Sequence, residues 1–153
     1  MATLFVGGAN SVARADETLK WRHVQYIASA QTQDVGDING HVMTMSRIPG
    51  IAFFSDGSTG ATLVNSAADL TNGSGMLGGY LTLTFSDGSA IFLKFAGAIK
   101  VEGTNATRGG TYTVVGGKGR YAGAKGDGTW DGSGAQVVIS AMSYIDNVIN
   151  IKK

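Results

Sequence analysis

Turn dipeptides that recur along the chain restrict its fold more than any other feature. Asp-Gly or Asn-Gly occurs six times, and such pairs are preferred in two-residue hairpin turns because both central residues need a positive φ. Between the dipeptides, apolar and polar residues alternate as in half-buried strands, and helical periodicity is almost absent. The six dipeptides are Asn39-Gly40, Asp56-Gly57, Asn72-Gly73, Asp87-Gly88, Asp127-Gly128 and Asp131-Gly132. The pattern predicts an all-β chain built from hairpins.

Reading between the turns predicts eight strands with little or no helix. In the clearest of them, Leu93 and Phe95 face one way and Lys94 faces the other. Pro49 lies inside another strand and predicts a bulge or bend there. The predicted strands span 19–33, 41–54, 60–67, 75–85, 89–102, 110–115, 123–131 and 136–151.

Several of these strands are long, which favours a closed antiparallel barrel over a sandwich of two sheets. Closure removes both sheet edges, and eight strands enclose space for one small ligand. Glycines inside the strands, such as Gly78 and Gly97, would relieve the curvature of closure. A chain of 153 residues suits one core. We expect a single eight-stranded barrel domain over residues 16–153.

Composition excludes several classes of function. The chain has 12 basic and 11 acidic residues without a basic stripe, so no nucleic-acid binding is expected. It has no Cys, which excludes thiol and iron–sulfur chemistry. His23 and His41 lack metal-ligand spacing, so no metal site is expected. No apolar run approaches the ~18 residues of a membrane span.

Because only 15% of residues are charged, we expect part of the surface to be hidden in a homo-oligomer.

Residues 1–15 differ from the rest of the chain. Leu4-Phe5-Val6 is a very short apolar run, and Ala13-Arg14-Ala15 fits a small-x-small cleavage site before Asp16. The segment is interpreted as a flexible tail or as the remnant of an export signal. The second interpretation predicts a periplasmic or secreted protein, and the first leaves it cytoplasmic.

The most distinctive stretch is the glycine-rich segment 114–126. Gly117, Gly119 and Ala122 match a dinucleotide-binding fingerprint, but that motif requires a following helix, and the glycines that come next exclude one. We instead expect a tight connection with left-handed backbone, with Tyr121 packed against the barrel.

The same segment resembles the signature of the allene oxide cyclase-like and dirigent-like barrels. That signature is Val-Val-Gly-Gly-x-Gly-x-aromatic-x-x-Ala-x-Gly, and here it runs from Val114 to Gly126 after the lead-in Gly110-Thr111-Tyr112. The resemblance implies an eight-stranded barrel, commonly trimeric, that binds an oxygenated hydrophobic compound without a cofactor.

The plant cyclases that the chain resembles carry a Glu-x-Asn pair on the first strand, lining the cavity. His23 and Gln25 are the matching positions, and residues two apart on a strand share a face. An imidazole here replaces a carboxylate, so fatty-acid epoxide cyclisation is not implied. Dirigent proteins use acidic groups around phenolic radicals, and the sequence offers no clear equivalent.

His23 is the main candidate for acid–base work, because an imidazole exchanges protons near neutral pH. Tyr121 or Tyr112 would assist it by donating a phenol to a ligand oxygen. A satisfied structural histidine and core-anchoring tyrosines are the alternatives. Further candidate ligand contacts are Gln25, Trp21, Tyr80 and Lys94, although Trp21 also suits packing and Lys94 also suits solvent.

Together these features predict a cofactor-independent isomerase, cyclase or lyase acting on a small oxygenated hydrophobic or aromatic molecule inside the barrel. The alternative is a non-catalytic exported binding protein for a small hydrophobic ligand. A weaker third interpretation is a structural barrel with a filled interior. An enzyme needs at least two polar groups converging on the lumen, a carrier needs only apolar lining, and a structural barrel has no cavity.

Overall fold

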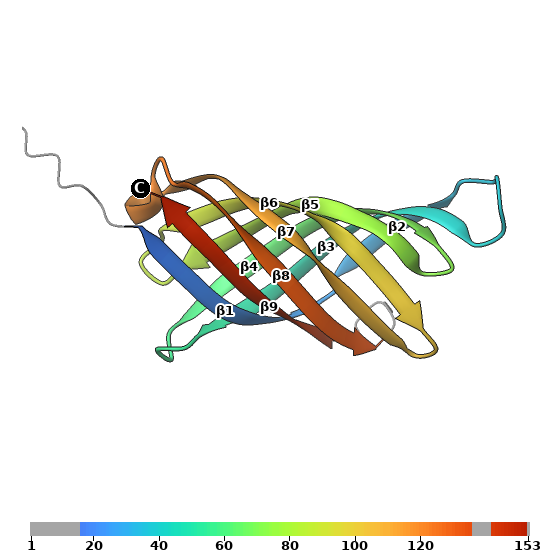
Figure 1. The fold of residues 1–153 in the computed structure, drawn as a ribbon, viewed down its shortest axis with the longest axis horizontal. Coiled ribbons are helices and arrows are strands. Elements are labelled where there is room, and N and C mark those ends of the chain that lie inside the picture. The colour runs from blue at the N-terminus through green and yellow to red at the C-terminus, as the bar shows by residue number, and fades with distance from the viewer. Residues whose placement is uncertain (1–15, 136–141, 153) are drawn as a thin grey trace, which may run out of the picture.

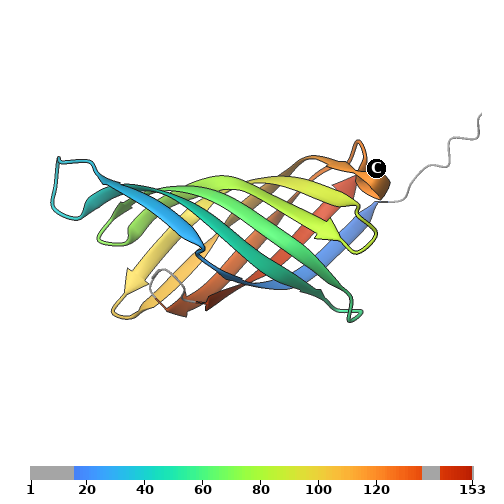
Figure 2. The same ribbon diagram turned by 180° about the vertical axis from the view of Figure 1, so that it is seen from behind.

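The chain forms a closed antiparallel barrel, as the hairpin pattern predicted. A computed structural model describes residues 16–135 and 142–152. Strands pair with their neighbours in chain order, and β1 pairs with both β9 and β3, which closes the barrel (Figures 1 and 2). The strands are β1 (Glu17–Tyr26), β2 (Ser29–Asp34), β3 (His41–Phe54), β4 (Thr59–Thr71), β5 (Ser74–Phe85), β6 (Ala90–Glu102), β7 (Asn105–Lys118), β8 (Lys125–Ala135) and β9 (Met142–Lys152).

The predicted first strand is divided into β1 and β2, which both lie along β3 and so count as one strand of an eight-stranded barrel. Gln25 pairs with Gly50 and Ser29 pairs with Arg47, so one strand advances four residues while the other advances three. This one-residue bulge lies opposite Pro49. The predicted bulge therefore exists, but the extra residue belongs to the neighbouring segment between Gln25 and Ser29 and not to β3 itself. Pro49 has no N–H to donate, and because the ladder is interrupted opposite it, no ladder hydrogen bond is lost.

The chain turns at four of the six predicted sites, at residues 39–40, 56–57, 72–73 and 87–88, but only Asn72-Gly73 has the predicted positive φ at both positions, because Asn39, Asp56 and Asp87 are not among the described residues with positive φ. Asn72 and Gly73 have φ values of 51° and 82°, as a type I′ turn requires. The other two predicted turns are wrong, because Asp127-Gly128 and Asp131-Gly132 lie inside β8. A Cβ on Gly128 would collide with the carbonyl oxygen of Val148, so this glycine permits close strand approach and does not make a turn.

The glycine-rich connection closes one end of the barrel. It contains a short 3₁₀ helix, η1 (Gly119–Tyr121), and Gly119 and Gly123 have φ values of 63° and 77°. Tyr121 is fully buried, and its ring centroid lies 5.0 Å from that of Phe85. The predicted tight, left-handed connection with an inward Tyr121 is confirmed.

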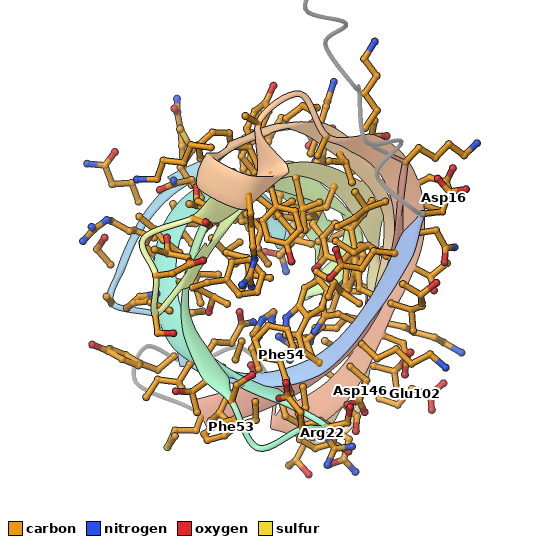
Figure 3. All side chains as sticks on the ribbon, turned by 90° about the vertical axis from the view of Figure 1, so that its left-hand side faces the viewer. Asp16, Arg22, Phe53, Phe54, Glu102 and Asp146 are labelled. Atoms are coloured by element: carbon orange, nitrogen blue, oxygen red, sulfur yellow. The ribbon has the colours of Figure 1, made fainter. Side chains whose placement is uncertain are left out.

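Alternation along the strands separates the interior from the outer surface. Viewed along the barrel from the η1 end, Phe54 points into the barrel while Phe53, Arg22 and Asp146 lie outside it (Figure 3). Leu81, Leu93 and Ile149 are among the fully buried residues of the core. None of the described residues forms a helix long and apolar enough to cross a membrane.

Candidate functional site

A cavity occupies the half of the barrel away from η1. The volume of the cavity, counted as the space that the centre of a water molecule can reach, is about 120 Å³. Met142 at its rim is 67% exposed, so the cavity reaches the surface at the end opposite η1. Its walls are mostly apolar and include Ile48, Val64, Leu77, Phe95, Trp130 and Ile145. A chamber of this kind suits a small molecule that is mainly hydrophobic.

His23 and Gln25 lie on the wall of this cavity. They occupy alternate inward positions of β1 and are 1% and 7% exposed. His23 Nε2 lies 2.8 Å from Oε1 of Gln25, an atom that can only accept a hydrogen bond. The ring therefore carries its proton on Nε2 and donates it to Gln25.

The other ring nitrogen of His23 also has a protein partner. Nδ2 of Asn147 lies 3.3 Å from Nδ1 of His23 and shares its two hydrogens among this nitrogen and the carbonyl oxygens of Ile145 and Trp21, which lie closer at 2.8 and 3.1 Å. Burial lowers the pKa of His23 from 6.5 to about 4, although the Gln25 hydrogen bond and the Asp146 carboxylate oppose this shift. His23 is consequently a neutral imidazole at neutral pH.

Asn147 joins His23 to Tyr112. The Tyr112 hydroxyl donates to Oδ1 of Asn147 over 2.8 Å, and Asn147 Nδ2 also donates to the carbonyl oxygen of Ile145 over 2.8 Å. Burial raises the pKa of Tyr112, so its phenol stays protonated and remains a donor. The buried network thus runs from Tyr112 through Asn147 and His23 to Gln25.

Asn147 was missed by the sequence reasoning, although a signal for it exists. It is the polar member of an inward series on β9, between Ile145 and Ile149. A buried amide in such a series needs partners, which here are supplied by three different strands. The amide orients His23 and Tyr112 toward the same region of the cavity.

Arg108 is a second residue that the sequence reasoning missed, and it lines the cavity. The predicted strand began at residue 110, whereas β7 begins at Asn105 and makes Arg108 an inward position. Its Nε atom is buried and has no hydrogen-bond partner among the described residues. Burial lowers the pKa of the Arg108 guanidinium, which nevertheless stays charged at any physiological pH.

The remaining predicted site residues lie away from the cavity. Tyr121 lies in the closed end, and its hydroxyl donates to Oε1 of Glu17 over 3.2 Å. Trp21 packs in the core, with its ring stacked 6.3 Å from that of Tyr112. Tyr80 is 55% exposed and Lys94 is exposed, because both occupy the outward face of their strands. None of these four is among the residues that line the cavity.

The described residues offer no metal-binding group. No group of three or more His, Asp or Glu side chains in residues 16–135 and 142–152 is arranged so that it could hold a metal ion. His41, at the start of β3, is instead held between two carboxylates, with Nδ1 2.6 Å from Asp37 and Nε2 2.7 Å from Asp69. It lies outside the cavity lining.

The closed eight-stranded antiparallel barrel with an interior cavity has the fold of solved dirigent proteins. The pterocarpan synthase dirigent protein PsPTS1 matches with a TM-score of 0.61 at 14% identity, over 92% of this chain and 96% of that protein. The pterocarpan synthase dirigent protein GePTS1 matches with a TM-score of 0.56 at 14% identity, over 100% and 98%. Neither a family model nor a curated protein matches the sequence. The comparison confirms the dirigent-like fold that segment 114–126 predicted.

Proposed function

We propose that the barrel takes up a small oxygenated hydrophobic or aromatic molecule and acts on it without a cofactor, as an isomerase, cyclase or lyase. The observation that carries this proposal is the hydrogen-bonded pair His23 and Gln25 on the wall of an apolar cavity. More than two polar groups converge on the lumen, as expected for an enzyme. A purely structural barrel would not need an interior cavity.

In this proposal neutral His23 donates its Nε2–H to a ligand oxygen and polarises it. In the free protein Oε1 of Gln25 accepts the hydrogen bond from this nitrogen, and a ligand oxygen would replace it as the acceptor. Tyr112 supplies a phenol, since it is linked to His23 through Asn147. Tyr121 is a less suitable partner, because its hydroxyl interacts with Glu17 at the closed end. General acid–base catalysis by such a group is worth about 10²–10⁴ in rate.

A non-catalytic exported binding protein is the second candidate. It is favoured by the fact that both ring nitrogens of His23 already have protein partners. A histidine with a pKa of about 4 is also a weak base. In a carrier, the same network would present fixed hydrogen-bonding groups to the ligand and would need no proton transfer.

Native mass spectrometry of the purified protein is the experiment that separates these candidates. The bound molecule would be identified, and the compound would then be incubated with wild-type protein and with a His23→Ala variant. Conversion by wild type but not by the variant supports the enzyme. Recovery of unchanged compound from both proteins supports the carrier, and the absence of any bound or bindable small molecule contradicts both.

We further propose that the protein is a homo-oligomer, most simply a trimer, and that it is exported. The first proposal is supported by exposed apolar side chains on the outer face of β3, including Met45, Ile51 and Phe53. The second is supported by the sequence Ala13-Arg14-Ala15, which lies outside the described residues.

A further inference from the structure

Arg108 is a charged group on the wall of a mostly apolar cavity. It occupies an inward position near the start of β7, whereas Tyr112 lies four residues further along the same strand. Four residues of an extended strand span roughly 13 Å. The cavity therefore has the His23 and Tyr112 network toward the barrel centre and a guanidinium toward the rim.

Among the residues that the structure describes, this guanidinium has no carboxylate partner. The chain contains 11 acidic residues, and all of them fall within the described ranges 16–135 and 142–152. No carboxylate among those residues forms an ion pair with Arg108, whereas Arg22 pairs with Asp146 and Arg120 pairs with Asp87. The buried Nε of Arg108 also lacks a hydrogen-bond partner in that part of the chain.

Arg108 is half-buried, and its Nε has lost water without gaining a partner, which is costly for a charged group. A ligand group that reaches this part of the cavity would supply the missing partner. Guanidinium presents a planar fork of N–H donors that matches the two oxygens of a carboxylate. The lining residues of the described cavity include no Asp or Glu that could compete for it.

We propose that Arg108 binds a carboxylate of the ligand, so that the molecule taken up by the barrel is an amphipathic monocarboxylic acid. Its carboxylate lies at Arg108 near the rim, and its apolar or aromatic body extends along Phe95 and Trp130 toward His23. This inference rests on the proposed ligand-binding role of the cavity. It names the ligand's charged group, which that proposal leaves open.

The test is isothermal titration calorimetry with two matched pairs of compounds, decanoate with 1-decanol and 2-naphthoate with 2-naphthol, at neutral pH. Wild type should bind the acid of each pair on the order of ten- to hundredfold more tightly than the alcohol, as a charged hydrogen-bonded contact implies. Arg108→Gln should abolish the preference and leave alcohol binding unchanged. Arg108→Lys should retain part of it.

Lys94→Gln is the matched control, since it removes one positive charge from the outer surface. It should bind all four compounds as wild type does. A thermal melt checks folding, and Arg108→Gln should melt no lower than wild type because it loses an unpaired charge. If the alcohols bind but the acids bind no more tightly, the assignment of Arg108 is overturned while the cavity proposal stands. If none of the four compounds binds, the cavity proposal falls, and the Arg108 proposal falls with it.

Discussion

His23 donates a hydrogen bond from Nε2 to Oε1 of Gln25 over 2.8 Å, between alternate residues of one strand. Both side chains face the cavity, and they are its innermost pair of polar groups on β1. The contact fixes the tautomer of His23 and leaves the two amide hydrogens of Gln25 available to a ligand.

Replacing His23 should reduce activity far more than it reduces folding. His23→Ala should lower turnover of the true substrate by about 10²–10⁴, the usual contribution of general acid–base catalysis. His23→Gln keeps a polar side chain and should retain ligand affinity better than activity. Gln25→Ala should weaken both. The measurement is steady-state kinetics with the compound found by mass spectrometry, and a His23→Ala variant with wild-type turnover would remove the catalytic role.

The burial of His23 predicts a loss of stability in mild acid. The unfolded chain takes up a proton near pH 6.5, whereas the folded protein takes it up only near pH 4. The free energy of unfolding should therefore fall as the pH drops through this range, by roughly 3 kcal/mol from this residue.

Urea denaturation from pH 7 to pH 4 measures this loss, and His23→Gln is the control. The pKa of His41 is raised by Asp69 and Asp37, so protonation of His41 has the opposite effect. That contribution is present in both proteins and cancels in the comparison. Wild type and variant should diverge as the pH falls, and parallel curves would contradict the prediction.

Close strand packing predicts that two adjacent glycines respond differently to substitution. A Cβ on Gly110 would collide with the carbonyl oxygen of Ala96, whereas a Cβ on Gly109 would come no closer than 3.3 Å to the carbonyl oxygen of Trp130. Gly110→Ala should therefore destabilise the protein by about 1–3 kcal/mol, as overpacking does. Gly109→Ala is the control and should cost less. Equal midpoints in urea denaturation would refute this interpretation of Gly110.

The exposed apolar face of β3 predicts self-association. Light scattering at micromolar concentration should give a multiple of the 15.7 kDa chain mass, with a trimer expected. Met45→Lys should dissociate the assembly, since it places a charge on a 68% exposed apolar site. Val115→Lys, at an exposed site on β7, is the control and should leave the mass unchanged. A monomer mass for wild type would end the proposal.

Export predicts that the natural protein begins at Asp16. Cleavage after Ala15 would follow from the small-x-small pattern at residues 13–15. Mass spectrometry of the protein from its native source measures the N-terminus directly. Met1 or Ala2 as the first residue, in a cytosolic fraction, would contradict this prediction.

Much of the fold could be predicted from local patterns. The alternation around Leu93 and Phe95 predicted which residues share a face, and Asn72-Gly73 predicted a hairpin turn. Turn chemistry alone was misleading at Asp127-Gly128, because glycine also occurs where another strand approaches closely. Only the strand pairing distinguishes these two uses of glycine.

The candidate site could also be predicted only in part, because local spacing shows which residues share a face of a strand. His23 and Gln25 follow a period of two, so their common face could be inferred from their spacing. Tyr80 and Lys94 share a face as well, but sequence spacing does not say whether a face points to the lumen or to solvent. Strand pairing places them on the outside.

The sequence by itself determined an all-β chain, its hairpins and the glycine-rich connection that places Tyr121 inside, since each depends on the conformational preferences of neighbouring residues. The tertiary structure alone decided that Arg108 lines the same cavity as His23 and that Asn147 contacts His23. These three residues come from β7, β1 and β9, and closure of the barrel brings them together. Contacts between residues so distant in the chain depend on strand register and barrel curvature, which local patterning does not encode.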